Sequence, residues 1–216
     1  MFEPQVFLPR VMLLVPLLLS LSVHEWAHAA SAYLLGDDTA SRDGRLTLNP
    51  LVHIDPIGTF VAPLMGVPFG WAKPVPVNPL RFRRDVPMRF GNLLVSAAGP
   101  VSNLILALLC AVAYGLLLRS GRIALGGGGV SFLLDRSIQL NVALFLFNLL
   151  PVPPLDGSRV VDGFVPYRLR PYWDQYAQYG GIALLLVVLF GGGLLARPIA
   201  FVSRPLLDLS HWIAGR

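Results

Sequence analysis

The sequence predicts an all-α polytopic membrane protein with about five to six membrane segments and a small β-hairpin or re-entrant element between the first two core spans. Of its 216 residues, 55% are hydrophobic and 13% are charged, which is about half the charged share of a soluble domain. The hydrophobic residues form long runs between short polar loops. This pattern indicates one integral-membrane domain over residues 1–216, with a core at 8–163 and extra membrane segments at 177–214.

The first predicted span covers residues 8–35 and ends at Gly36, which precedes two aspartates. Arg10 lies before an apolar stretch, and Ala27-His28-Ala29 imitates a cleavage site, so a signal peptide is the alternative. The apolar run is longer than that of a signal peptide, which favours a permanent span.

For the region between the first two core spans, the sequence predicts short and irregular elements. Asp43-Gly44 and the alternating Leu46 and Leu48 predict a short β-hairpin within residues 39–55. Residues 56–69 are apolar but are interrupted by Pro63, Gly66 and Pro68, which favours a re-entrant segment over a full span. Residues 71–80 are proline-rich and are expected to be extended, as a possible second strand.

Four later apolar runs complete the predicted fold. Residues 90–118 and 131–150 are expected to form two core spans. Residues 180–195 are apolar again, and residues 196–213 form a weaker, proline-interrupted segment that either spans the membrane or lies at its interface.

The net charge of +5 is distributed in short clusters between apolar runs, such as Arg81-Phe82-Arg83-Arg84 and Arg168-Leu169-Arg170. This distribution is typical of positive-inside membrane topology, and we expect a lipid bilayer rather than nucleic acid as the partner. It places both clusters on the cytoplasmic side. His24 lies twelve residues before Gly36, or roughly 18 Å along a helix, so its site would lie below the cytoplasmic surface.

His24-Glu25-Trp26-Ala27-His28 is an H-E-x-x-H motif inside the first predicted span. On one helical face the two histidines can share a zinc ion, and the glutamate can act as a general base. A charge at the centre of a membrane helix costs about 2.5–3.5 kcal/mol on insertion scales, so these polar residues indicate a functional site. The alternative is a set of polar side chains packed between spans.

A catalytic zinc site needs a third protein ligand. The extended motif with a downstream histidine is absent, because Ser31 and Leu34 occupy the required positions. Asp156 is a candidate, because the prolines after Asn148 break the span there and can turn the chain back toward the first helix. Asp156 can instead cap the helix that follows it. Cys110 is the only cysteine, which excludes disulfides and a cysteine-based zinc site.

Together these motifs resemble those of the site-2 protease family of intramembrane zinc metalloproteases, in its compact bacterial branch. The resemblance rests on H-E-x-x-H in the first core span and on the segment NLLPVPPLDG at residues 148–157. It extends to AGPVSN at 98–103, NPLVHIDPIG at 49–58 and GWAKPVP at 70–76. The resemblance implies one Zn²⁺ per chain, held by His24, His28 and Asp156, with Glu25 as catalytic acid and base. It also implies a chain without PDZ or CBS domains.

The implied activity is hydrolysis of peptide bonds within or near transmembrane segments of membrane-protein substrates. The implied location is the bacterial inner membrane, as a multi-pass protein with its active site toward the cytoplasm. Asn148, Asn103 and His53 are candidate substrate-binding residues. Both asparagines can instead form hydrogen bonds between helices, and His53 can serve as a loop residue.

Two other functions compete with proteolysis. One is a catalytically silent zinc-binding membrane protein that mediates interactions. The other is a metal transporter, which would need polar residues along several spans, whereas here they converge on one place. The sequence makes no prediction of the oligomeric state.

Overall fold

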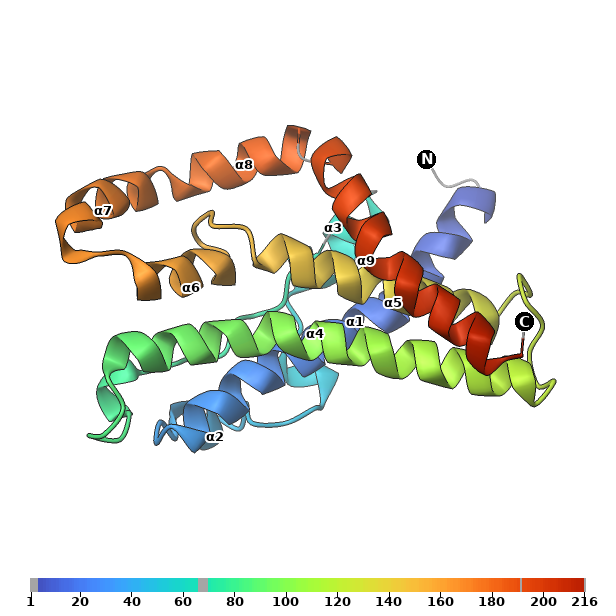
Figure 1. The fold of residues 1–216 in the computed structure, drawn as a ribbon, viewed down its shortest axis with the longest axis horizontal. Helices are drawn as coiled ribbons and strands as arrows, with labels where there is room; N and C mark the ends of the chain where they lie inside the picture. The colour runs from blue at the N-terminus through green and yellow to red at the C-terminus, as the bar shows by residue number, and fades with distance from the viewer. Residues whose placement is uncertain (1–3, 66–69, 191, 216) are drawn as a thin grey trace.

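The structure is a computed structural model that describes residues 4–65, 70–190 and 192–215 (Figure 1). Three long apolar helices form its framework: α1 (Pro4–Leu34), α4 (Met88–Arg119) and α5 (Val130–Asn148). Their positions match the predicted core spans, because continuous apolar runs of this length form membrane-spanning helices.

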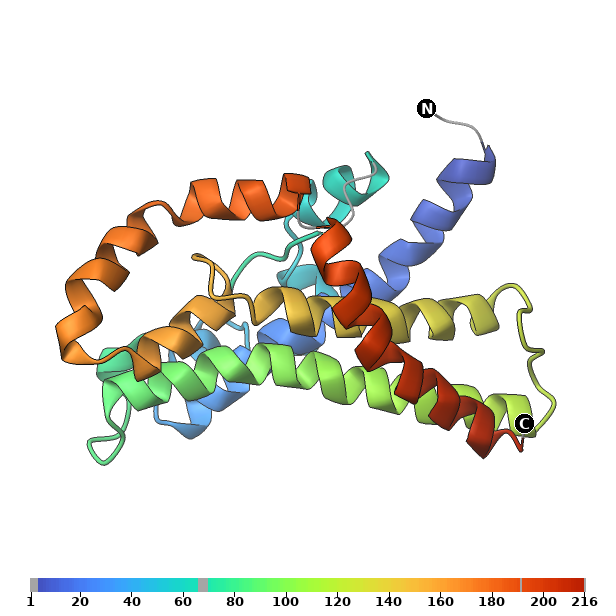
Figure 2. The ribbon, with the colours of Figure 1, turned by 45° about the horizontal axis from the view of Figure 1, so that its top comes forward.

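Helix α4 is the centre of the fold. It packs against α1, α5, α6 (Asp156–Phe164) and α9 (Gly192–Ile213), and Figure 2 shows α9 crossing over α5 toward the end of α4. Gly99, Asn103, Ala107, Ala111 and Gly115 are all buried and follow one another at four-residue spacing along α4. Small residues on one helical face let neighbouring helices approach closely, as is typical of membrane helix packing.

Helix α6 lies against the N-terminal half of α4 after the chain turns back from α5. A Cβ atom at Gly163 would lie only 2.5 Å from the Leu93 side chain, so the two helices are in direct contact there. Arg89 of α4 donates to the carbonyl oxygens of Asp162 and Val165 at the end of α6. These contacts fix the helix that begins with Asp156.

The chain continues from α6 through η4 (Tyr167–Leu169), α7 (Arg170–Gln178) and α8 (Gly180–Phe190). In Figure 1 these elements form the orange arc beside the three-helix framework, and α9 then returns across it.

The predicted β-hairpin is wrong, and the described residues contain no strand. Residues Thr39–Arg42 form the short helix α2, and Gly44 lies in the left-handed region with a φ of 67°. Arg45 N–H donates to Ala40 O at 2.7 Å, and Gly44 N–H donates to Ser41 O at 3.1 Å. This pair of bonds is a Schellman motif, so Asp43-Gly44 ends a helix instead of turning a hairpin.

The predicted re-entrant segment forms two short helical turns, η2 (Pro56–Val61) and α3 (Ala62–Leu64), which pack against α1. Asp55 caps η2 by accepting the N–H groups of Ile57 and Gly58. The last part of this prediction, residues 66–69, lies outside the described residues. Residues 71–78 are extended without strand pairing, since Pro74 and Pro76 lack the N–H groups that a ladder needs.

The count of five to six membrane segments was too high for the residues that the structure describes. Three helices are long and apolar enough to cross a membrane, within residues 10–34, 88–119 and 130–148. Helices α8 and α9 pass the same test only as a pair bent by 74°, which gives at most four spans. The prediction failed because Gly180–Phe190 and Gly193–Ile213 count as one bent pair and not as two full spans.

Candidate metal and catalytic site

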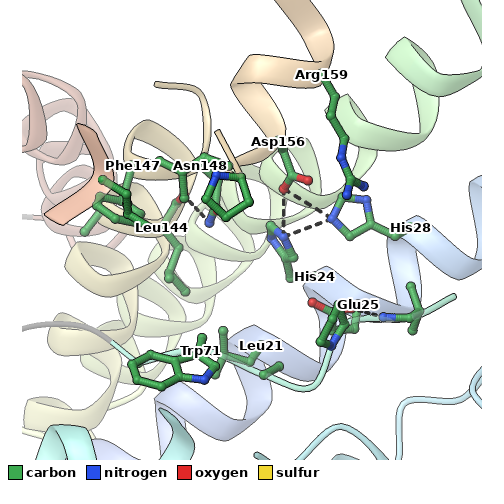
Figure 3. Close-up of a pocket in the computed structure, with 18 of the residues that line it drawn as sticks. Leu21, His24, Glu25, His28, Trp71, Leu144, Phe147, Asn148, Asp156 and Arg159 are labelled. Carbon is green, nitrogen blue, oxygen red and sulfur yellow. Dashed lines mark hydrogen bonds and ion pairs between the residues drawn. The ribbon is translucent and has the colours of Figure 1, made fainter. Parts of the chain in front are cut away.

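Three side chains from two helices meet beside α4. His24 Nε2 lies 3.0 Å from His28 Nε2, and Asp156 Oδ2 lies 3.1 Å and 3.2 Å from these two nitrogens (Figure 3). The histidines come from α1, four residues apart on its buried face, and Asp156 is the first residue of α6. The structure therefore brings together the three residues that the sequence proposed as metal ligands.

The other nitrogen of each ring fixes its tautomer. His28 Nδ1 lies 2.7 Å from Val95 O, and His24 Nδ1 lies 2.6 Å from Asn103 Oδ1. Both oxygens are acceptors, so each Nδ1 carries the proton and donates it. In the neutral rings the two Nε2 atoms then present lone pairs to Asp156.

The amide orientation of Asn103 is fixed by its own partners. Asn103 Nδ2 donates to Ser20 O at 3.2 Å and to Asn141 Oδ1 at 2.9 Å. Asn141 Nδ2 in turn donates to Ser137 O at 2.8 Å. A backbone carbonyl can only accept, so this chain of bonds leaves Asn103 Oδ1 as the acceptor for His24. Hydrogen bonds between α1, α4 and α5 thus fix the orientation of the His24 ring.

This donor set fits a zinc ion. Tetrahedral ligands about 2.0–2.1 Å from Zn²⁺ stand about 3.3 Å from one another, close to the separations seen here. A divalent cation can accept all three lone pairs at once, whereas one proton between them serves only two. Nδ1–H groups that donate to carbonyl oxygens are also the usual support of metal-ligating histidines.

The Asp156 carboxyl is suited to bind a cation. Burial raises the pKa of this carboxyl, but hydrogen bonds and charge interactions with the His24 and His28 rings outweigh this effect and lower the pKa when the two Nε2 atoms carry protons. A metal cation held by the three groups takes the place of those protons and favours the ionised carboxylate in the same way.

Gly99 leaves the space that the two rings occupy. A Cβ atom there would lie 2.4 Å from His28 Nε2 and 2.7 Å from His24 Nε2. Any larger residue would therefore push against the donor atoms themselves. The close approach of α4 to α1 at this point depends on the absence of a side chain.

Glu25 lies on the same helix as the histidines and is held by the extended segment. Its Oε2 atom accepts the Val75 N–H at 2.8 Å, and the side chain lines the cavity below the histidines (Figure 3). Val75 lies between Pro74 and Pro76, which have no N–H, so it supplies the backbone donor at this point of the segment.

The extended segment is fixed at several points. Lys73 N–H donates to His53 O at 2.9 Å, and Asn78 N–H donates to Asp37 Oδ2 at 2.6 Å. Arg45 is buried and donates from Nη2 to Lys73 O at 2.5 Å. These bonds hold the Val75 N–H in place for Glu25.

A cavity of about 610 Å³ opens beside the three donor atoms. Its polar lining is His24, Glu25, His28, Asn148, Asp156 and Arg159, and its remaining walls are mostly apolar side chains from α5, α8, α9 and residues 70–77. A volume of this size is within the usual range of small-molecule and peptide-side-chain sites. Leu144, Phe147 and Trp71 lie at the end away from His28 (Figure 3).

Of the three candidate substrate-binding residues, only Asn148 lines this cavity, where its side chain also donates to Leu144 O at 3.0 Å. Asn103 is fully buried behind His24, outside the cavity lining, and its Oδ1 atom accepts a hydrogen bond from the His24 ring. His53 is also buried outside the cavity lining, and its Nε2 atom lies 2.9 Å from Thr47 O.

Comparison with known proteins shows which family the chain belongs to. The chain is 46% identical over 181 residues to "Putative zinc metalloprotease YwhC" of Bacillus subtilis, and the match covers 81% of this chain and 78% of that protein. The chain belongs to peptidase family M50. The family model "Peptidase family M50" matches residues 118–188, which include Asp156.

Further relatives of this M50 peptidase are "Putative zinc metalloprotease Rip2" proteins from two mycobacteria. The Mycobacterium tuberculosis (strain ATCC 25618 / H37Rv) protein is 33% identical over 179 residues, which cover 83% of this chain and 67% of that protein. The Mycolicibacterium smegmatis protein is 31% identical over 201 residues, with 90% and 70% covered. No solved structure matches the chain.

The resemblance to site-2 proteases is confirmed by these relatives. The M50 peptidase is a zinc metalloendopeptidase, and Zn²⁺ is its cofactor. Its apolar helices make it a membrane protein.

Proposed function

We propose that this M50 peptidase hydrolyses peptide bonds within or near the transmembrane segments of membrane-protein substrates. The proposal rests on the position of His24, His28 and Asp156, which we call the donor cluster. Its two histidines are buried on a candidate membrane span, beside a largely apolar cavity. A cavity of this kind favours a hydrophobic segment over a soluble peptide rich in charge.

In this proposal His24, His28 and Asp156 hold the zinc ion. Bound zinc polarises a carbonyl group and lowers the pKa of water toward 7. Glu25 takes a proton from the attacking water and returns it to the leaving amine. Only Glu25 Oε2 is hydrogen-bonded within the described residues, to the Val75 N–H, which fixes the carboxylate and leaves Oε1 for the proton.

We further propose that the site faces the cytoplasmic side of a bacterial inner membrane. The basic clusters at 81–84 and at 168–170 lie in the connections between the apolar helices, and the positive-inside rule assigns such clusters to the cytoplasm. His24 lies twelve residues before Gly36, or roughly 18 Å at 1.5 Å per residue, which supports a site below the membrane surface.

The proposal is tested with the purified full chain in liposomes, mixed with single-span membrane proteins. We expect zinc-dependent cuts inside or next to the span, mapped by mass spectrometry of the fragments. A zinc chelator should stop cleavage, and added zinc should restore it. Cleavage that continues after zinc removal, or that occurs only in soluble loops, would contradict the proposal.

A further inference from the structure

Arg159 is the only cationic side chain among the described residues that line the cavity. It lies on α6, three residues after Asp156, so the two side chains share one face of the helix. Figure 3 shows the Arg159 side chain extending toward the ring of His28. Its guanidinium therefore lies next to the donor cluster, at the edge of the space that a substrate would enter.

Within the part of the chain that the structure describes, this guanidinium has no protein anion as a partner. Arg159 is exposed and forms no ion pair or hydrogen bond within the described residues. Asp162, the other carboxylate of α6, pairs with Arg170 at 3.2 Å. A positive charge in the first turn is also unfavourable to the helix itself, because that end of a helix carries partial positive charge. The position of Arg159 thus needs an explanation other than stability.

The charges of the site indicate what it would bind. Among the described residues, Glu25 and Asp156 are the two carboxylates that line the cavity, and together they balance the charge of one divalent cation. Arg159 adds one positive charge to this neutral set. A substrate that covers the cavity excludes water from the guanidinium, which is costly unless an anion pairs with it. Peptide hydrolysis creates such an anion when the carbonyl oxygen gains negative charge during attack by water.

We propose that Arg159 is a further catalytic residue that binds the negatively charged carbonyl oxygen of the scissile bond in the transition state. This inference rests on the proposed function. The water oxygen bonds to the carbonyl carbon, the π electron pair moves to the carbonyl oxygen, and the guanidinium donates hydrogen bonds to that oxygen. Because this charge is absent from the bound substrate, the contact raises kcat and leaves KM nearly unchanged.

The test compares Arg159→Ala and Arg159→Lys with wild type, using Arg168→Ala as a control. Arg168 is exposed on η4, does not line the cavity and forms no ion pair within the described residues. We expect Arg159→Ala to lower kcat by about 10²–10³-fold, the usual loss for one oxyanion donor. Arg159→Lys should be intermediate, guanidinium salts should partly rescue Arg159→Ala, and the zinc content should equal that of wild type.

A binding measurement separates this inference from the proposed function. A phosphinic peptide carries the negative charge of the transition state, and Arg159→Ala should weaken its binding by a factor similar to the loss in kcat. Equal phosphinic peptide affinity in the two proteins, or a rise in KM alone, would overturn the role of Arg159. So would a loss that disappears when acidic residues of the substrate become amides, because Arg159 would then recognise those acids. A wild-type protein that binds the phosphinic peptide without cleaving any membrane protein would overturn the proposed function instead.

Discussion

Replacing Glu25 by Gln is expected to lower the cleavage rate by about 10²–10⁴-fold, the usual contribution of a general acid–base group, while zinc stays bound. The Gln side chain has nearly the same shape, and its amide oxygen can still accept the Val75 N–H that Glu25 Oε2 accepts at 2.8 Å. It cannot take a proton from water. The variant therefore removes the proposed chemistry and preserves the geometry.

The measurement combines zinc analysis of the purified Glu25→Gln protein with cleavage of a single-span substrate in liposomes. Glu25 is not one of the three residues in the donor cluster, so one zinc per chain should remain. Full cleavage by the variant would contradict its role as the proton acceptor. Loss of zinc would show that Glu25 supports the metal and not the proton transfer.

Replacing Gly99 by Ala is expected to remove most of the bound zinc. The new Cβ would lie 2.4 Å from His28 Nε2 and 2.7 Å from His24 Nε2, well inside van der Waals contact. Both rings are held from behind by Val95 O and Asn103 Oδ1, so they cannot move aside without losing a hydrogen bond. One methyl group should thus displace both nitrogen donors.

The matched control for Gly99→Ala is Gly181→Ala, a glycine in helix α8 whose Cβ would meet no atom within 4 Å. Zinc content is measured in both proteins, with circular dichroism to show that each retains its helices. We expect zinc loss only in Gly99→Ala. A fully loaded Gly99→Ala protein with normal helicity would show that the metal lies elsewhere.

The long helices could be predicted from the sequence because a membrane leaves few structural choices. Residues 90–118 were expected to span, and α4 covers Met88–Arg119. In the region between α1 and α4, the sequence was compatible with more than one local structure. Asp43-Gly44 is compatible with a hairpin turn and with a helix end, and only the bonds from Gly44 and Arg45 back to α2 decide between them.

The members of the donor cluster could be predicted from the sequence, but the groups that hold them in place could not. The spacing of His24 and His28 follows from helix geometry, and the prolines before Asp156 indicated a chain that turns back. Asn103 was identified as a polar residue on a span, but its partner could not be found without the register between α1 and α4. The Val75 N–H that holds Glu25 is a backbone group, so no side-chain pattern indicates it.

Arg159 was missed although the sequence contained a signal for it. It lies three residues after Asp156 in the segment expected to begin a helix, so the two side chains could be placed on one face. What the sequence could not show is that Asp162 already pairs with Arg170, which leaves Arg159 without an acidic partner within the described residues.

The central claim is that one zinc ion is held jointly by α1 and α6. X-ray absorption at the zinc edge of the purified protein tests it most directly. We predict two imidazole nitrogens and carboxylate oxygen at about 2.0–2.2 Å, without sulfur, and a changed spectrum in Asp156→Ala. A sulfur ligand, or a spectrum unaltered by the loss of Asp156, would contradict the two-helix zinc site.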